Sequence, residues 1–277
     1  MAGKISTWIG NLMNLCKFGV KLECFGVPLR KALLLAAQAG AQGVQFDAVG
    51  ELSPAKLSES GRREISILLR SYNLQLAAIF CPLRNGLDTS IDQEQRLIHV
   101  KQNMDLAFDL GSKVLALHAG QIPQEKENSR IATLTESLTF LGAHGDRAGV
   151  SLALETGLES GKVLADFLAT IDSGALGAGL NPGNLKLHGH DPLQAVLDLG
   201  KRIKLVHATE FESNGPGRTA REVPLGKGDF DWNSLMVYLD QSGFHDYLIC
   251  EKNEGTDKAT QMINGLDFLK TLNNFGS

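Results

Sequence analysis

The chain has 277 residues, of which 43% are hydrophobic and 21% are charged, and its formal net charge is −4 at pH 7. This length suits one large domain or two small ones, and the apolar fraction is enough for a packed core. The acidic balance and the lack of a basic run argue against a nucleic-acid-binding surface, because neutralising phosphates requires clustered Lys and Arg.

Short apolar runs alternate along the chain with longer stretches in which apolar residues recur at three- and four-residue spacing. The short runs predict strands and the longer stretches predict helices. The eight predicted strands cover residues 19–25, 43–47, 74–80, 113–118, 149–155, 176–181, 203–207 and 247–251.

Capping residues mark the expected starts of several helices. Ser53 and Asp191 each precede a proline, which suits the first position of a helix, and Asp231 precedes another helical stretch. The longest irregular region, residues 211–230, follows the seventh strand. A loop of that length in a compact domain is usually functional.

Repeated strand–helix alternation predicts a parallel sheet, because each crossover returns the chain to the same edge. Eight such units predict an α/β fold, a single (β/α)8 TIM barrel over residues 1–277. The competing open, doubly wound sheet would have fewer strands and a glycine-rich phosphate turn after the first one. The sequence contains neither GxGxxG nor GxxxxGK(S/T).

Polar residues stand at the ends of four successive strands in the second half of the chain. They are Glu155, Asn181, His207 and Glu251. The carboxyl ends of barrel strands meet at one mouth, so these side chains are expected to converge there. Their oxygen and nitrogen atoms are plausible ligands for a divalent metal ion, and the two carboxylates could exchange a proton with a carbon beside a carbonyl. Rim ion pairs, a structural histidine and an Asn-Pro-Gly turn are the alternative interpretations.

Five other residues are weaker candidates. His118 ends the fourth strand and is either a hydrogen-bond donor to substrate or a structural histidine. Glu159 lies on the opening turn of the next helix, within reach of the site, and Asp47 ends the second strand. Arg218 and Lys227 in the long loop are either ligands of a phosphate or sugar hydroxyl or solvated loop charges.

The cysteine usage and the N-terminal stretch favour a soluble cytoplasmic protein. Four cysteines (Cys16, Cys24, Cys81, Cys250) lack CxxC spacing, and we expect buried, reduced thiols, because disulfide frameworks are typical of small secreted domains. The N-terminal stretch has no continuous apolar signal region, and no window is long and apolar enough to span a bilayer.

The chain resembles the xylose-isomerase-like barrel superfamily of sugar and sugar phosphate isomerases and epimerases, which also includes endonuclease IV. The resemblance extends over about residues 22–272 and rests on ALETG, GLNPGNL, VHATE, EVPLGKGDFDW and LICEKN, in this order. It implies a divalent metal ion (Mn, Mg, Co or Zn) with Glu155, His207 and Glu251 among its ligands, the two glutamates also forming the acid/base pair. It further places Asn184 and Arg218 where relatives contact the substrate.

The chain departs from the superfamily pattern at the second metal ligand, where relatives have Asp and this chain has Asn181. Fewer anionic ligands weaken the hold on a hard cation. A weaker or different metal, an altered reaction and a catalytically silent relative all remain open, and our hypothesis is that metal still binds, with Asn181 as an oxygen ligand. The DNA-repair branch is disfavoured, because Asn184 stands where endonuclease IV has one of its extra metal-binding histidines.

The sequence therefore predicts a metal-dependent isomerase or epimerase of a keto sugar, polyol-derived ketone or sugar phosphate, acting through an enediolate. A catalytically impaired sugar-binding barrel of the same superfamily is the alternative. The expected partner is a small molecule, not a nucleic acid or a membrane, and a homodimer stays open. The substrate is not determined, because specificity depends on which loop side chains face the site.

Overall fold

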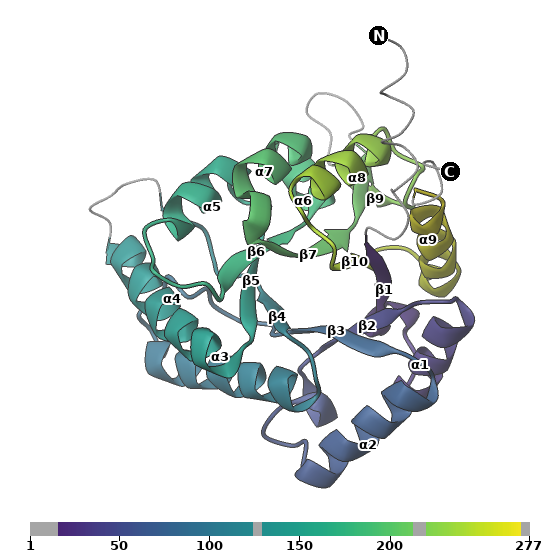
Figure 1. Cartoon of the computed structure of the whole chain (residues 1–277), viewed down its shortest axis with the longest axis horizontal. Helices are drawn as coiled ribbons and strands as arrows, with labels where there is room; N and C mark the ends of the chain where they lie inside the picture. The colour runs from purple at the N-terminus through teal and green to yellow at the C-terminus, as the bar shows by residue number, and fades with distance from the viewer. Residues whose placement is uncertain (1–15, 124–128, 213–219, 273–277) are drawn as a thin grey trace, which may run out of the picture.

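The computed structural model describes residues 16–123, 129–212 and 220–272. Eight parallel strands close into a barrel in the order β1-β10-β7-β6-β5-β4-β3-β2, with the helices around it (Figure 1). The predicted (β/α)8 barrel is therefore confirmed. The barrel strands are β1 (Lys17–Lys21), β2 (Gly43–Asp47), β3 (Gln75–Phe80), β4 (Val114–Leu117), β5 (Ser151–Glu155), β6 (Leu176–Leu180), β7 (Ile203–Ala208) and β10 (Tyr247–Cys250).

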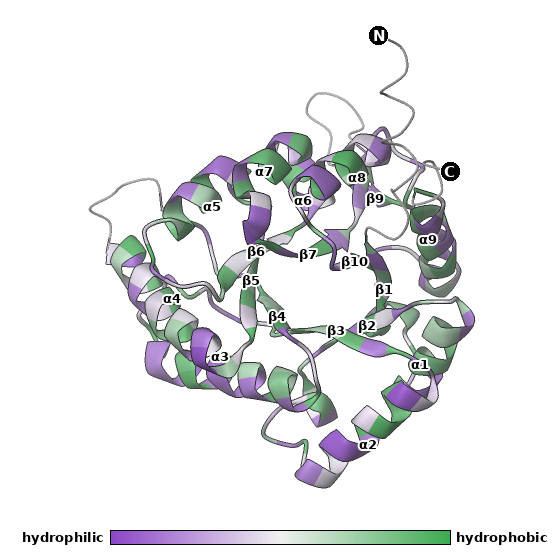
Figure 2. Ribbon diagram, viewed as in Figure 1, coloured by the Kyte–Doolittle hydropathy of each residue, from purple (hydrophilic) through white to green (hydrophobic). Residues whose placement is uncertain are grey.

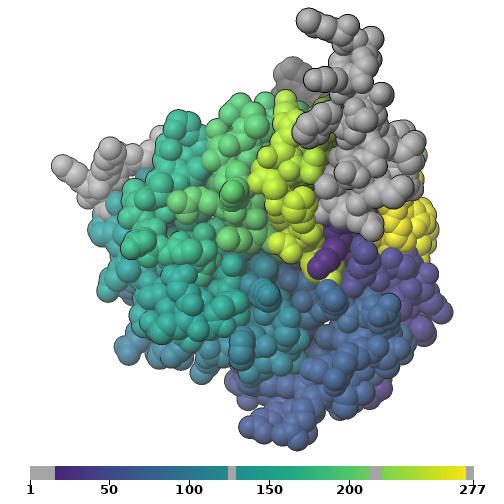
Figure 3. Space-filling view, in the orientation of Figure 1, coloured from purple at the N-terminus to yellow at the C-terminus, as the bar shows by residue number. Residues whose placement is uncertain are grey.

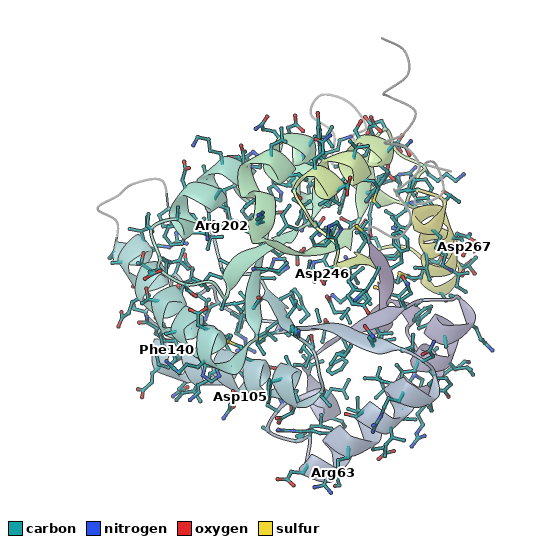
Figure 4. The ribbon with its side chains drawn as sticks, in the orientation of Figure 1. Arg63, Asp105, Phe140, Arg202, Asp246 and Asp267 are labelled. Carbon is teal, nitrogen blue, oxygen red and sulfur yellow. The ribbon has the colours of Figure 1, made fainter. Side chains whose placement is uncertain are left out.

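The helices cover the outside of the barrel and turn their hydrophobic faces towards it. Figure 2 shows hydrophobic colour on the strands, and Figure 4 shows the charged residues Arg63 and Asp267 on the outer side of the helices. The helices are α1 (Leu29–Gln38), α2 (Glu59–Ser71), α3 (Gln93–Asp109), α4 (Ser129–Ala148), α5 (Gly161–Leu168), α6 (Pro182–Leu187), α7 (Pro192–Leu199), α8 (Trp232–Gln241) and α9 (Lys258–Leu272). None of the described helices is long and apolar enough to cross a membrane.

Two hydrophobic clusters make up the core. The larger one lies between the helices and the barrel wall. The smaller one comes only from strands and consists of Ala77, Ala78, Phe80, Ala116, Ala153, Leu205, Tyr247 and Ile249. Side chains of this kind fill a barrel interior, and the space inside the ribbon ring is occupied in the space-filling view (Figure 3). All four cysteines are buried thiols, as expected.

The first strand differs from its prediction over residues 19–25. Strand β1 ends at Lys21, and a 3-10 helix, η2 (Leu22–Phe25), follows it. Three of the four residues of this helix are buried, and Gly26, with φ of 63°, ends it. The strand prediction for residues 22–25 is therefore wrong, because an apolar run alone does not separate a strand from a buried helical turn.

Two of the three predicted helix starts are confirmed. Asp191 and Asp231 cap α7 and α8 by accepting hydrogen bonds from backbone N–H groups of the first turn. Ser53 does not start a helix, because its hydroxyl donates to Gly50 O, and α2 begins further on with Ser58 as its cap.

The long region after the seventh barrel strand is less irregular than predicted. Strands β8 (Glu210–Glu212) and β9 (Arg221–Val223) pair antiparallel within it. The carboxylate of Glu210 is buried and accepts hydrogen bonds from the backbone of Gly226 at 2.6 Å and from Trp232 Nε1 at 3.1 Å. These bonds tie the segment after β9 to the start of α8.

Candidate active site

The structure brings the four strand-end residues to one mouth of the barrel. Strands β5, β6, β7 and β10 are consecutive neighbours in the closed sheet. Glu155 is the last residue of β5, Asn181 follows β6, His207 lies near the end of β7 and Glu251 follows β10. Because these strands run parallel, all four residues lie at the same end of the barrel.

Glu155 is at the centre of the hydrogen bonds at this mouth, and its side chain is only 5% exposed. Its Oε1 accepts hydrogen bonds from Nδ2 of Asn181 at 2.8 Å and from Nδ2 of Asn184 at 3.0 Å. Its Oε2 lies 3.4 Å from His207 Nδ1 and 3.6 Å from His118 Nε2. Burial alone would raise the pKa of Glu155, but His207, His118 and Asn181 together lower that pKa to about 2. The group is therefore a carboxylate at neutral pH.

The imidazole of His207 is completely buried, and its Nδ1 faces Glu155. Its Nε2 lies 2.8 Å from Oε1 of Gln45, and because an amide oxygen only accepts, Nε2 carries the hydrogen. Burial would lower the pKa of His207, but the negative charges of Glu155 and Glu251 raise it above its ordinary value. Both glutamates thus act on one imidazole, which the edge of the Phe80 ring also approaches, with centroids 6.2 Å apart.

A lysine lies beside the second carboxylate. Lys21 Nζ is 2.8 Å from Glu251 Oε1, 3.4 Å from Asp47 Oδ1 and 4.8 Å from the centre of the Phe80 ring. The side chains of Lys21 and Glu251 are 11% and 7% exposed. Burial would lower the pKa of Lys21, but the two carboxylates raise it, so the ammonium ion persists. The sequence reasoning missed Lys21, because the predicted first strand continued past it and hid a polar residue at a strand end.

Asn181 both donates a hydrogen bond to Glu155 and caps the helix that follows β6. It caps α6, and its Oδ1 accepts hydrogen bonds from Asn184 N–H at 3.0 Å and from Thr209 Oγ1 at 2.5 Å. The same short helix carries Asn184 round to Glu155. The loop after β5 approaches Asn184 closely at Gly157, where φ is 148° and a Cβ would lie 2.7 Å from the Asn184 Cβ. Only glycine permits this approach without strain.

The remaining predicted residues are placed less centrally. The side chain of His118 is 60% exposed and reaches the site from the end of β4. Glu159 is half-buried, and burial raises its pKa to about 7; its Oε2 has no hydrogen-bond partner among the described residues. Lys227 is exposed in the turn after β9. Arg218 lies outside the described residues.

The hydrogen bonds of the mouth do not fit the divalent metal that the resemblance implies. Asn181 turns its N–H, not its oxygen, towards Glu155, and Glu251 is already bound to Lys21. Within the described ranges, no group of three or more His, Cys, Asp or Glu side chains is arranged to hold a metal ion. The predicted ligands Glu155, Asn181, His207 and Glu251 are thus at one mouth, but Asn181 donates to one carboxylate and Lys21 donates to the other.

Solved structures with the same barrel are numerous, although their sequences have diverged. The chain is similar to a xylose isomerase domain protein from Planctomyces limnophilus, with 21% identity, a TM-score of 0.81 and coverage of 94% of this chain and 97% of that one. An L-ribulose 3-epimerase has 17% identity and a TM-score of 0.78, covering 94% and 95% of the two chains. A xylose isomerase-like TIM barrel protein from Mycobacterium smegmatis, solved in complex with magnesium, has 15% identity and a TM-score of 0.77, covering 94% and 97%.

These similarities establish the fold, and the family follows from the sequence. A search among curated proteins gave no match. The model of the xylose isomerase-like TIM barrel family matches residues 33–272, which is most of the chain and includes all four strand-end residues of the mouth. The chain therefore belongs to the xylose isomerase-like TIM barrel family.

Proposed function

We propose that this chain is an isomerase or epimerase that moves a proton next to the carbonyl of a keto sugar, polyol-derived ketone or sugar phosphate. The observation that carries the proposal is the pair of buried carboxylates, Glu155 and Glu251, at the ends of β5 and β10 in the same barrel mouth. The shared fold of the L-ribulose 3-epimerase supports a keto sugar as the substrate class.

The chemistry requires a base, an acid and positive charge near the carbonyl oxygen. One carboxylate takes the proton from the carbon, and the electron pair of the C–H bond moves to the carbonyl oxygen, giving an enediolate. For isomerisation, the same group returns this proton to the neighbouring carbon, while the hydroxyl proton there passes to the former carbonyl oxygen. For epimerisation, the other carboxyl group, protonated from solvent beforehand, gives its proton to the opposite face of the same carbon, and the base keeps the proton it took. An N–H group that can reach the ligand, such as that of the exposed His118 imidazole, stabilises the developing oxyanion.

We assign the binding of sugar hydroxyls to three other side chains. His118 is exposed beside Glu155, and Asn184 offers an amide from α6. Glu159, with its pKa near 7, is partly protonated at neutral pH and can donate as well as accept a hydrogen bond. The roles of Arg218 and Lys227 as ligands of a phosphate or hydroxyl stay predictions.

A second candidate function is binding of a sugar-like ligand without turnover. The observation that favours it is the state of Glu155, whose Oε1 accepts two amide hydrogen bonds, whose Oε2 lies 3.4 Å from His207 Nδ1, and whose pKa is lowered to about 2. A carboxylate held in this way is a weak base. In this case Glu251 would have to carry the proton transfer, or no transfer would occur.

Solvent exchange distinguishes the two functions. A panel of ketoses is incubated with the protein in heavy water, and deuterium at the carbon next to the carbonyl is measured by mass spectrometry. We expect label with wild type and a loss of about 10²-fold or more in Glu155→Gln and Glu251→Gln. Glu212→Gln, on the half-exposed β8, is the matched control and should behave as wild type. Ketose-induced thermal stabilisation without any label would favour the binding barrel, and absence of both would reject both functions.

A further inference from the structure

Neighbouring groups fix the orientation of the Asn181 side-chain amide. Its Oδ1 faces the backbone N–H of Asn184, which can only donate, so the oxygen must be on that side. The hydroxyl of Thr209 donates to the same oxygen. The N–H side therefore faces Glu155, at 2.8 Å. To ligate a metal beside Glu155, the amide would have to turn over and give up all three hydrogen bonds in a site where it is 2% exposed.

The other side of the mouth already contains a positive charge. The ammonium of Lys21 lies between Glu251 Oε1, at 2.8 Å, and Asp47 Oδ1, at 3.4 Å, over the face of Phe80. Lys21, Glu251 and Phe80 are about nine-tenths buried, and Asp47 is 20% exposed. A dication bound to Glu251 would meet this ammonium at short range with little water between them, and like charges repel strongly under those conditions.

Both carboxylates that would bind a metal ion thus already accept hydrogen bonds from donors of the protein itself. An amide joins Glu155 to the end of β6, and an ammonium joins Glu251 to the ends of β1 and β2. We propose that this member of the family works without a divalent cation and that the ammonium of Lys21 supplies the positive charge facing the ligand's carbonyl oxygen or enediolate. The role of Lys21 towards the ligand rests on the proposed function, whereas the absence of a divalent cation does not.

The first test is metal binding by the full chain. The protein is treated with chelator and dialysed, and Mn²⁺ binding is followed by electron paramagnetic resonance, with the thermal midpoint measured in Mn²⁺, Mg²⁺ and Co²⁺. We expect neither saturable Mn²⁺ binding nor a rise in the midpoint for wild type. Saturable binding of Mn²⁺ by wild type that Glu155→Gln or Glu251→Gln abolishes would overturn the proposal.

Variants provide the converse test. The double variant Asn181→Asp with Lys21→Met restores an acidic ligand and removes the ammonium, so we expect it to bind Mn²⁺ and to gain several degrees of thermal midpoint from it. The matched control combines Asn181→Asp with Lys17→Met, because Lys17 is at the opposite, amino-terminal end of β1. Equal Mn²⁺ binding by the two double variants would show that Lys21 does not exclude the cation.

The solvent-exchange assay tests the role of Lys21 towards the ligand. We expect deuterium exchange by wild type to be unchanged by chelator and to fall about 10²-fold in Lys21→Met, with Lys17→Met unaffected. Exchange that appears only with added metal would overturn the cation-free site while upholding the proposed function. Absence of exchange under all conditions, together with absence of metal binding, would reject the proposed function and the ligand role of Lys21 but support the cation-free mouth.

Discussion

The Nδ2 of Asn181 lies 2.8 Å from Oε1 of Glu155, and this hydrogen bond joins the ends of β5 and β6 at the barrel mouth. The oxygen of this amide caps α6, and its nitrogen donates a hydrogen bond to a carboxylate whose side chain is 5% exposed. The pair therefore depends on the donor character of the residue at position 181.

Asn181→Asp is expected to destabilise the protein by roughly 2–4 kcal/mol at neutral pH, because it puts a second buried negative charge against Glu155. Since Glu155 has a pKa of about 2 in the wild type, the new carboxyl is the one that has to take up a proton. The free energy of unfolding from urea denaturation measures the effect. Asn233→Asp on the exposed face of α8 is the control, and equal stability of the two variants would contradict the argument.

Gly157→Ala is expected to cost roughly 1–3 kcal/mol and to displace Asn184 from Glu155. The residue has φ of 148°, and an added Cβ would lie 2.7 Å from the Asn184 Cβ. Gly174→Ala is the matched control, because a Cβ there has its nearest contact at 3.5 Å, with Asp146 Oδ1. Thermal denaturation of both variants provides the measurement, and similar losses at the two positions would argue against a special role for Gly157.

We expect the ionisation of Glu159 to make the protein less stable as the pH rises. A salt-bridged carboxylate, whose pKa is lowered, has the opposite effect. Its pKa is raised from 4.5 to about 7, so the folded state holds a proton that the unfolded state releases. The resulting stabilisation is present below pH 4.5 and is lost as the pH rises through about 7. Glu159→Gln, which keeps a neutral side chain, should unfold about 2 °C or more above wild type at pH 8 and at nearly the same temperature at pH 5. A constant difference across this range would show that ionisation of Glu159 is not the cause.

Glu210→Ala is expected to lower the free energy of unfolding by about 2–4 kcal/mol, because it leaves buried N–H groups without an acceptor. The carboxylate accepts from Gly226 N at 2.6 Å, Trp232 Nε1 at 3.1 Å and Phe230 N at 3.3 Å. Trp232 is 2% exposed, so a red shift of its fluorescence would report loosening of this segment. Glu212→Ala, at a half-exposed position of the same strand, should have little effect on either signal.

The order of the strands and the location of the site follow from local patterns. Alternating apolar runs and helical stretches were sufficient to predict eight parallel strands, and polar residues at the ends of apolar runs identified Glu155, Asn181, His207 and Glu251. The predicted strand ends were less accurate where the apolar run in the sequence continues beyond the end of the strand. Residues 22–25 continue the apolar pattern of β1 as a buried 3-10 helix, so periodicity could not separate them.

Local sequence determined which residues reach the mouth, because the end of a strand is marked by the change from an apolar run to polar and turn-forming residues. Which charges meet there was decided by closure of the barrel. Lys21 and Glu251 are 230 positions apart, and they become neighbours only because β1 pairs with β10 in a register that sets Val20 beside Cys250. The hydrogen bond from Asn181 to Glu155 likewise joins residues 26 positions apart. Hydrogen bonds between distant segments depend on strand register and on packing, and the spacing of residues along the chain determines neither of them.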